Sequence, residues 1–153
     1  MKKLVFFFSL LIVAASCGSD KKSEDNKDEG IKLGQQSTST SKADLKASME
    51  RGEELYTGLC IACHMANGTG VANTFPPLDG SDWLTTKRTE SIHAVKFGQQ
   101  GEITVNGETY NSVMAPLGLS DKEVADVLNY VMNSWSNTQD KMVTEAEVAA
   151  VNK

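Results

Sequence analysis

The sequence predicts an all-α domain that carries one small β-hairpin. Apolar side chains recur at helical spacing over residues 44–59 and again after Ser120, where a capping box opens the second pattern. Between them, Asn106-Gly107 separates two short β-prone runs and indicates a tight hairpin. Helices therefore form the body of the domain. The hairpin must pack against them, because two strands alone are marginally stable.

The first 16 residues are predicted to be a signal peptide. The chain starts with a basic MKK, and the apolar run from Leu4 to Ala15 has 12 residues, fewer than the roughly 20 that a membrane-spanning helix needs. Small residues end the run directly before Cys17, and this pattern resembles the cleavage site of bacterial lipoproteins. The resemblance implies that Cys17 is acylated and becomes the new N-terminus. An ordinary signal peptide followed by an incidental cysteine is the alternative.

Residues 17–43 are predicted to be a flexible tether between the acylated cysteine and a domain that occupies residues 44–153. The 26 residues after Cys17 contain no aromatic side chain and have Ile31 and Leu33 as their sizeable apolar ones. Such a segment cannot bury enough surface to offset its ordering entropy. Its fully extended length is about 90 Å. We expect an exported domain, lipid-anchored to a bacterial membrane and facing the periplasm, with the outer membrane or the cell surface as further candidates.

The charge of the domain excludes nucleic acid as a partner. From Ala43 onward the chain has eight Lys and Arg residues against fifteen Asp and Glu residues, a formal net charge of −7. A surface of this sign repels phosphate backbones. It serves either solubility alone or docking to a basic patch on a partner protein, and the composition leaves both interpretations open.

The first helix is expected from Asp44, a candidate N-cap, to Leu59, and directly after it comes Cys60-Ile61-Ala62-Cys63-His64. In an oxidising compartment two cysteines so close together are bonded or capped. A structural zinc site usually needs a second, separated pair of ligands, but after this stretch the chain offers one histidine, His93, and no further cysteine. A thiol-disulfide oxidoreductase would place the motif after a strand, whereas a helix precedes it here.

Covalent haem attachment is the interpretation that fits the motif. Both thiols, Cys60 and Cys63, add to the two vinyl groups of one c-type haem, and His64 binds its iron. The site then uses both cysteines of the domain and leaves no free thiol. The cofactor expected is a single covalent haem c.

What occupies the second axial position of the iron distinguishes an electron carrier from a site that binds external ligands. Met114 is the candidate ligand, because it lies in a non-helical stretch where a methionine has no obvious core to fill. His93 is the rival ligand, although it falls within a short predicted helix over residues 89–97 that ends at Gly98. If neither residue holds the iron, the site opens to peroxide, NO or CO.

The predicted final elements are a long helix and a short terminal one. Ser120 and Glu123 have the spacing of a capping box. The apolar positions that follow at helical spacing are Val124, Val127, Leu128, Val131 and Trp135. A second possible box, at residues 144–147, predicts a brief helix through Ala150.

With Cys60, Cys63, His64 and Met114 in place, the region from Asp44 onward resembles a mono-haem class I cytochrome c. The resemblance implies the fold of that family, in which a few helices surround the haem and the first and last helices cross. The positions that match the crossing are Gly52, Tyr56, Val127, Tyr130 and Val131. The proline whose carbonyl accepts a hydrogen bond from the proximal histidine would be Pro76 or Pro77. Gly68 and Gly70 are expected close to the haem or in turns.

The stretches "NGTGVANTFPPLDGSDWL" and "ITVNGETYNSVMAPLGLSDKEVADVLNYVMNSW" also resemble cytochrome domains that are fused to copper nitrite reductases or serve as electron-transfer subunits. The function implied is that of an electron carrier rather than an enzyme. Expected donors are a quinol-oxidising complex or a dehydrogenase, and expected acceptors are a terminal oxidase or a nitrite reductase. The alternatives are a haem enzyme or gas sensor with a displaceable ligand, a dedicated subunit of an oxidoreductase complex, and an interaction lipoprotein without haem.

Overall fold

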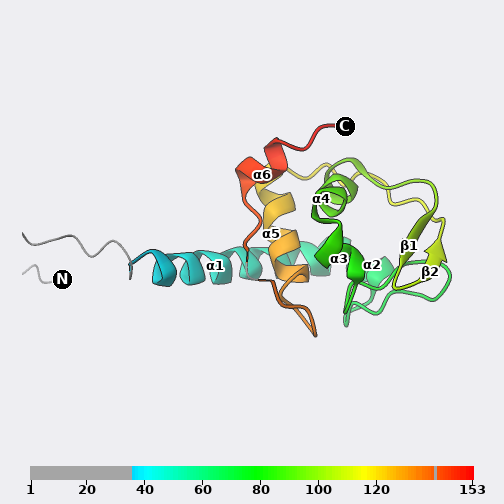
Figure 1. Cartoon of the computed structure of the whole chain (residues 1–153), viewed down its shortest axis with the longest axis horizontal. Coiled ribbons are helices and arrows are strands. Elements are labelled where there is room, and N and C mark those ends of the chain that lie inside the picture. The colour runs from blue at the N-terminus through cyan, green and yellow to red at the C-terminus, as the bar shows by residue number, and fades with distance from the viewer. Residues whose placement is uncertain (1–35, 140) are drawn as a thin grey trace, which may run out of the picture. The chain divides into compact units, whose positions relative to one another are not determined.

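The fold is mostly helical with one two-stranded antiparallel sheet, as predicted (Figure 1). The computed structural model describes residues 36–139 and 141–153, with side chains from Ser41 onward. The expected signal peptide, Cys17 and the tether as far as residue 35 lie outside the described residues. Within the described part, no helix is both long enough and apolar enough to cross a bilayer.

Helix α1 (Gln36–Leu59) begins eight residues earlier than predicted. Asp44 therefore lies inside the helix and is not its N-cap, and residues 36–43 are helical rather than part of a flexible tether. The side chains of residues 41–44 are exposed, so burial of apolar surface is not what orders this turn. Once a helix has nucleated, each added residue gains one backbone hydrogen bond at little cost, and this extends α1 beyond its packed part.

Helix α5 (Asp121–Val131) crosses α1 and forms the centre of the core (Figure 1). Its predicted capping box is confirmed, since the Ser120 side chain accepts a hydrogen bond from the backbone of Glu123 and the Glu123 side chain accepts one from the backbone of Ser120. Trp135 does not continue the helical pattern. It follows the end of α5 with a φ of +57°.

The crossing of the two helices depends on Gly52. A Cβ at this position would overlap the carbonyl oxygen of Asp126 and lie 2.8 Å from the Cβ of Tyr130. Beside the crossing, Tyr56 is 1% exposed and its ring packs against Tyr130 and Trp135, with centroid distances of 5.5 and 5.4 Å. The predicted close approach of the two helices at Gly52 is therefore confirmed, and three aromatic rings pack together beside it.

A buried carboxylate ties α1 to α5. Asp126 accepts two hydrogen bonds of 2.7 Å from the guanidinium of Arg51, one of 2.6 Å from the Ser48 hydroxyl and one of 2.6 Å from the Lys122 ammonium. Burial by itself would raise the pKa of Asp126, but these hydrogen bonds outweigh it and lower that pKa to about 2. Asn129 extends the network, because its amide donates to Ser48 and pairs with the backbone of Val143.

We expect Asp126 to make stability depend on acid pH. Its folded pKa lies below the roughly 3.9 of an unfolded aspartate, so its contribution is complete above about pH 4 and is lost as the pH falls through about 2. Asp126→Asn should lower the free energy of unfolding at pH 7 by about 2–4 kcal/mol and flatten its decline between about pH 5 and pH 2. Denaturant titrations across this range measure both effects. Glu54→Gln, which removes an exposed carboxylate of α1, is the control, and an equal flattening in that variant would contradict the assignment.

The predicted hairpin forms from β1 (Ile103–Val105) and β2 (Glu108–Tyr110), with Ile103 paired to Tyr110. Asn106 and Gly107 form its turn with φ values of +51° and +82°, as a two-residue turn of this kind requires. The hairpin packs at the start of α3 (Asp82–Thr86), a helix that was not predicted. Asn106 and Asp82 exchange two hydrogen bonds of 2.9 Å, each from a backbone N–H to the other's side-chain oxygen.

The remaining predicted helices also form. Helix α4 (Arg88–Phe97) ends at Gly98, which has a φ of +85°. Helix α6 (Glu145–Ala149) starts after Thr144, whose hydroxyl accepts a hydrogen bond from the backbone of Glu147. Arg88 pairs with Glu147 at 2.6 Å and thereby holds α6 against α4.

Candidate functional site

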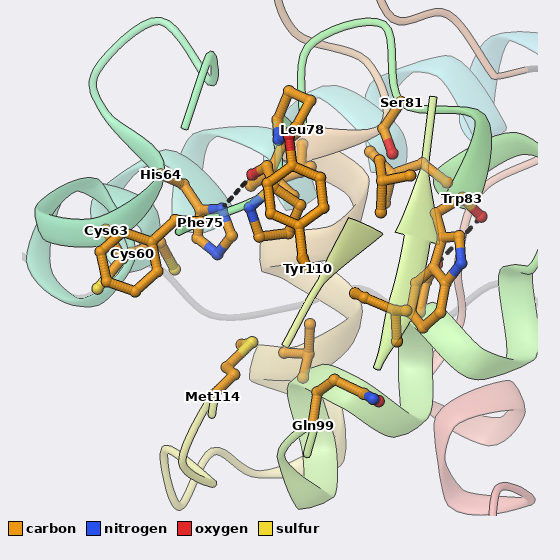
Figure 2. A pocket seen from close by; sticks show the side chains of 18 of the residues that line it. Cys60, Cys63, His64, Phe75, Leu78, Ser81, Trp83, Gln99, Tyr110 and Met114 are labelled. Atoms are coloured by element: carbon orange, nitrogen blue, oxygen red, sulfur yellow. Dashed lines mark hydrogen bonds between the residues drawn. The ribbon is translucent and has the colours of Figure 1, made fainter. Parts of the chain in front are cut away.

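One cavity brings the predicted site residues together. The space between its walls is about 1050 Å³, including its open side. Its walls come from the turn after α1, the loop that follows, α3, α4, the hairpin, the loop around Met114 and α5 (Figure 2). The apolar side chains that line it include Phe75, Leu78, Leu84, Val95, Ile103, Val105, Val127, Leu128 and Val131.

Cys60, Cys63 and His64 lie on one short turn at this cavity. Helix α2 (Ile61–His64) follows α1 almost without a break, and the backbone N–H groups of Cys63 and His64 both donate to the carbonyl of Cys60, at 3.1 and 2.9 Å. Burial, and secondarily the charge of Cys63, raises the pKa of the Cys60 thiol to about 11. Both cysteines are free thiols at the cavity wall. This turn was not predicted as a helix, although the residue spacing already placed the three side chains together.

His64 is held by Pro76, and this decides between the two candidate prolines. The Nδ1 atom of His64 lies 3.0 Å from the carbonyl oxygen of Pro76. Since a carbonyl only accepts, Nδ1 carries the proton and Nε2 keeps its free lone pair. Burial lowers the pKa of His64, with the Pro76 hydrogen bond acting in the opposite direction, and this shift favours the neutral ring, which is the form that binds a metal.

Gly70 and Gly68 lie close to this bond, in turns with φ values of +62° and +69°. A Cβ at Gly70 would lie 2.6 Å from the Pro76 carbonyl oxygen, and the Gly70 N–H donates to the His64 carbonyl at 3.1 Å. A Cβ at Gly68 would meet the Trp135 ring at 2.7 Å. Both glycines therefore permit the tight loop that supports His64.

Met114 projects into the same cavity from the opposite side. Figure 2 shows its thioether sulfur turned toward the imidazole of His64. Its backbone is fixed by two hydrogen bonds of 2.8 Å with the backbone of Gln99, one in each direction. Gly98 allows this pairing, because a Cβ there would lie 2.6 Å from the Met114 carbonyl oxygen. The sequence analysis did not predict that Gln99 fixes the backbone of Met114. The available signal was Gly98, which ends α4 directly before Gln99.

His93, the rival candidate, does not line this cavity. It lies on α4 with its ring against Phe97, at a centroid distance of 5.2 Å, and it borders a separate surface hollow. The structure therefore brings Met114 and not His93 to the side of the cavity that faces His64. Nor does the described part of the chain contain a cluster of three or more His, Cys, Asp or Glu side chains for a zinc ion.

The cavity fits a haem. Its walls are apolar, and the groups offered to a ligand are two thiols, one imidazole nitrogen and one thioether sulfur, a donor set suited to attaching a porphyrin and binding iron on both faces. Trp83 also lines it, and the indole Nε1 is buried without a hydrogen-bond acceptor among the described residues. An acceptor on a bound group is one way to satisfy this donor.

Comparisons with known proteins agree with this site. The family model described as cytochrome c matches residues 49–135. The chain is 37% identical over 93 residues to cytochrome c-552 of Thermus thermophilus, an alignment that covers 58% of this chain and 70% of that protein. It is 34% identical over 125 residues to the cytochrome c subunit of a quinone alcohol dehydrogenase from Gluconobacter oxydans, covering 78% of this chain and 26% of the subunit.

A third relative is the cytochrome c subunit of a gluconate 2-dehydrogenase from Pantoea cypripedii, 31% identical over 112 residues, covering 68% of this chain and 24% of that subunit. The chain thus spans about a quarter of the length of each dehydrogenase subunit and most of the length of the small cytochrome. It belongs to the cytochrome c family, as a class I member that carries one covalent c-type haem and transfers electrons rather than catalysing a reaction of its own.

Proposed function

We propose that the chain is a lipid-anchored electron carrier in which Cys60 and Cys63 hold the haem and His64 and Met114 are its axial ligands. The observation that carries this proposal is the convergence of an imidazole Nε2 and a thioether sulfur from opposite sides of an apolar cavity with two thiols in its wall. When bound, the haem supplies an iron that cycles between ferric and ferrous forms.

The two cysteines attach the cofactor by addition. Cys60 and Cys63 would hold the haem through a thioether bond from each Sγ to one carbon of a vinyl group, the hydrogen of the thiol going to the other carbon, so no oxidant or reductant would be consumed. Because Cys60 directly precedes α2 while Cys63 and His64 lie within it, attachment and axial ligation would come from one short hydrogen-bonded turn. Rigid ligands keep the reorganisation on electron transfer small.

The residues around the two ligands favour a carrier over a sensor. The Pro76 carbonyl orients the ring of His64 and raises its basicity as a ligand, and the Gln99 pairing holds Met114 in place on the other side. A thioether ligand and an apolar wall both favour the ferrous state, so we expect a moderately positive potential. With both sides filled by protein, no position is left for a gas or peroxide.

The proposed cellular setting rests on the N-terminal sequence. Residues 1–16 serve as the signal peptide, Cys17 carries the lipid, and the domain faces the periplasm from a bacterial membrane. The relatives that are subunits of dehydrogenases support a role beside a membrane oxidoreductase, from which this domain takes electrons or to which it gives them. A terminal oxidase or a nitrogen-oxide reductase is a suitable acceptor.

Extraction and mass measurements test attachment and anchoring together. Protein made in a host that attaches haem should keep its colour in acidified organic solvent, while Cys60→Ser and Cys63→Ser should each weaken this retention and the double variant abolish it. The intact mass should correspond to a chain that begins at Cys17 and carries acyl groups plus one haem. Colour that passes into the solvent would refute the thioethers, and a mature chain without acyl groups would refute the anchor.

A further inference from the structure

The ammonium group of Lys96 joins the ends of three helices. Lys96 lies in the last turn of α4, and its Nζ is 2.9 Å from a carboxylate oxygen of Asp121, the first residue of α5. The same Nζ donates to the carbonyls of Val148 and Val151, at the end of α6 and just past it, at 2.9 and 3.3 Å. The Lys96 side chain is 16% exposed, so these partners replace most of its contact with water.

The Lys96–Asp121 ion pair lies at the base of the segment that carries Met114. Residues 97–120, which separate the two partners along the chain, contain the end of α4, the whole hairpin and the loop around Met114. The ion pair therefore brings the two ends of this segment together. Three residues beyond Lys96, the backbone of Gln99 pairs with that of Met114. The segment is thus fixed twice, by an ion pair at its base and by backbone hydrogen bonds beside Met114.

Two of the partners of Lys96 belong to the C-terminal end of the chain. Val148 and Val151 lie outside residues 49–135, the part that the cytochrome c family model matches. Replacing the ammonium by an apolar group would leave the Asp121 carboxylate without this charge partner and would remove a hydrogen bond from each carbonyl. Such a replacement would therefore release the base of residues 97–120 from both α5 and the C-terminal end.

We propose that Lys96 and Asp121 are positioning residues that keep the Met114 sulfur on the haem iron. They act through the backbone: fixing the base of residues 97–120 keeps the pairing of Gln99 with Met114 closed, and this pairing holds the thioether toward His64. The inference rests on the proposed ligation of the iron by Met114. It goes further than that ligation, because it assigns the residues that set how often the sulfur leaves the iron.

A second ion pair on α4 provides a matched control. Arg88, the first residue of that helix, pairs with Glu147 of α6 at 2.6 Å. The side chains of Arg88 and Glu147 are 21% and 24% exposed, compared with 16% and 32% for Lys96 and Asp121. Breaking either pair removes an ion pair of similar burial and loosens α6. Of the two, the pair at Lys96 is the one that closes residues 97–120.

The rate at which saturating imidazole binds to the ferric, full-length holoprotein measures how often the sulfur leaves, because imidazole must take the position of Met114. Lys96→Met keeps an alkyl chain, removes the ammonium, and should raise this rate about tenfold. Asp121→Asn should raise it about fivefold, and the double variant should be about as fast as Lys96→Met, because both changes remove one interaction. The control Arg88→Met should stay within about twofold of the unmodified protein.

Hydrogen exchange of the Gln99 and Met114 amides gives a second readout that does not depend on iron. Each of these N–H groups donates across the pairing at 2.8 Å. Relative to the amide of Leu128, a core residue that reports global stability, we expect both to exchange about tenfold faster in Lys96→Met and within about twofold of the unmodified protein in Arg88→Met. Nuclear magnetic resonance spectra of the reduced holoprotein in deuterated buffer measure these rates.

Unchanged imidazole binding and amide exchange in Lys96→Met and Asp121→Asn would overturn the proposal. An equal acceleration in Arg88→Met would also overturn it, because it would show general loss of stability. If Lys96→Met does not fold, Asp121→Asn decides, since it keeps the ammonium and its two carbonyl partners. These failures occur in a protein whose ferric form shows the weak red absorption of methionine-bound iron. An unmodified protein without that absorption would instead refute ligation by Met114, and the proposal with it.

Discussion

Met114→Ala should remove the weak red charge-transfer absorption of the ferric protein and open the haem to external ligands. The Met114 sulfur faces His64 across the cavity, and the methyl group of alanine cannot reach the position it leaves. The ferrous variant should therefore bind CO rapidly, which the unmodified protein should not do. The potential should fall on the order of 0.1 V, a fraction of the roughly 0.8 V that axial ligands span.

The control for this substitution is another methionine. Met142 precedes α6 and does not line the cavity, so Met142→Ala should keep both the red absorption and the resistance to CO. Absorption spectra and flash photolysis of CO measure the two properties in the same samples. Rapid CO binding by the unmodified protein would contradict the carrier function and favour a sensor or a haem enzyme.

Gly52→Val should strongly destabilise the fold. Its Cβ would overlap the Asp126 carbonyl oxygen, and the atoms that it meets are backbone and the Cβ of Tyr130, which cannot rotate away. The helices must separate, which breaks the contacts of Tyr56 and the hydrogen bonds of Asp126. We expect the free energy of unfolding to fall by about 4 kcal/mol or more, as is typical when a core is overpacked and a buried hydrogen-bond network is broken. Denaturant unfolding of the holoprotein measures it.

Gly58 provides a matched comparison within the same helix. A Cβ at Gly58 would meet no atom within 4 Å, so Gly58→Ala should stabilise the protein by about 0.5–1 kcal/mol through helix propensity alone. The two substitutions thus have opposite expected signs. Similar small effects at both positions would show that α1 and α5 do not cross as closely as described.

Patterns within a few residues predicted the elements that they control. Ser120 and Glu123 predicted the start of α5, and Asn106-Gly107 predicted the hairpin turn, because each pattern satisfies backbone groups locally. The start of α1 and the position of Trp135 were predicted wrongly. Both depend on how far a helix propagates beyond its packed part, which side-chain periodicity does not encode.

In the candidate site, too, contacts between neighbours along the chain were predicted from the sequence, and contacts between distant residues were not. Cys60, Cys63 and His64 are neighbours along the chain, so their spacing alone placed them on one turn. Pro76 and Pro77 are equivalent in the sequence, and only the folded loop shows whose carbonyl contacts His64. The pairing of Met114 with Gln99 joins residues that are fifteen positions apart, and the local signal at Gly98 marks the end of α4 without identifying the segment that pairs there.

The early start of α1 limits how far the domain can travel from its proposed anchor. Residues 36–43 span about 12 Å as a helix, whereas the same eight residues would span up to about 28 Å if extended. The maximum separation between Cys17 and the packed part of the domain therefore falls from about 90 Å to about 75 Å. If Cys17 anchors the protein as proposed, its redox partners must lie in a layer beside the membrane whose depth is this separation plus the size of the domain.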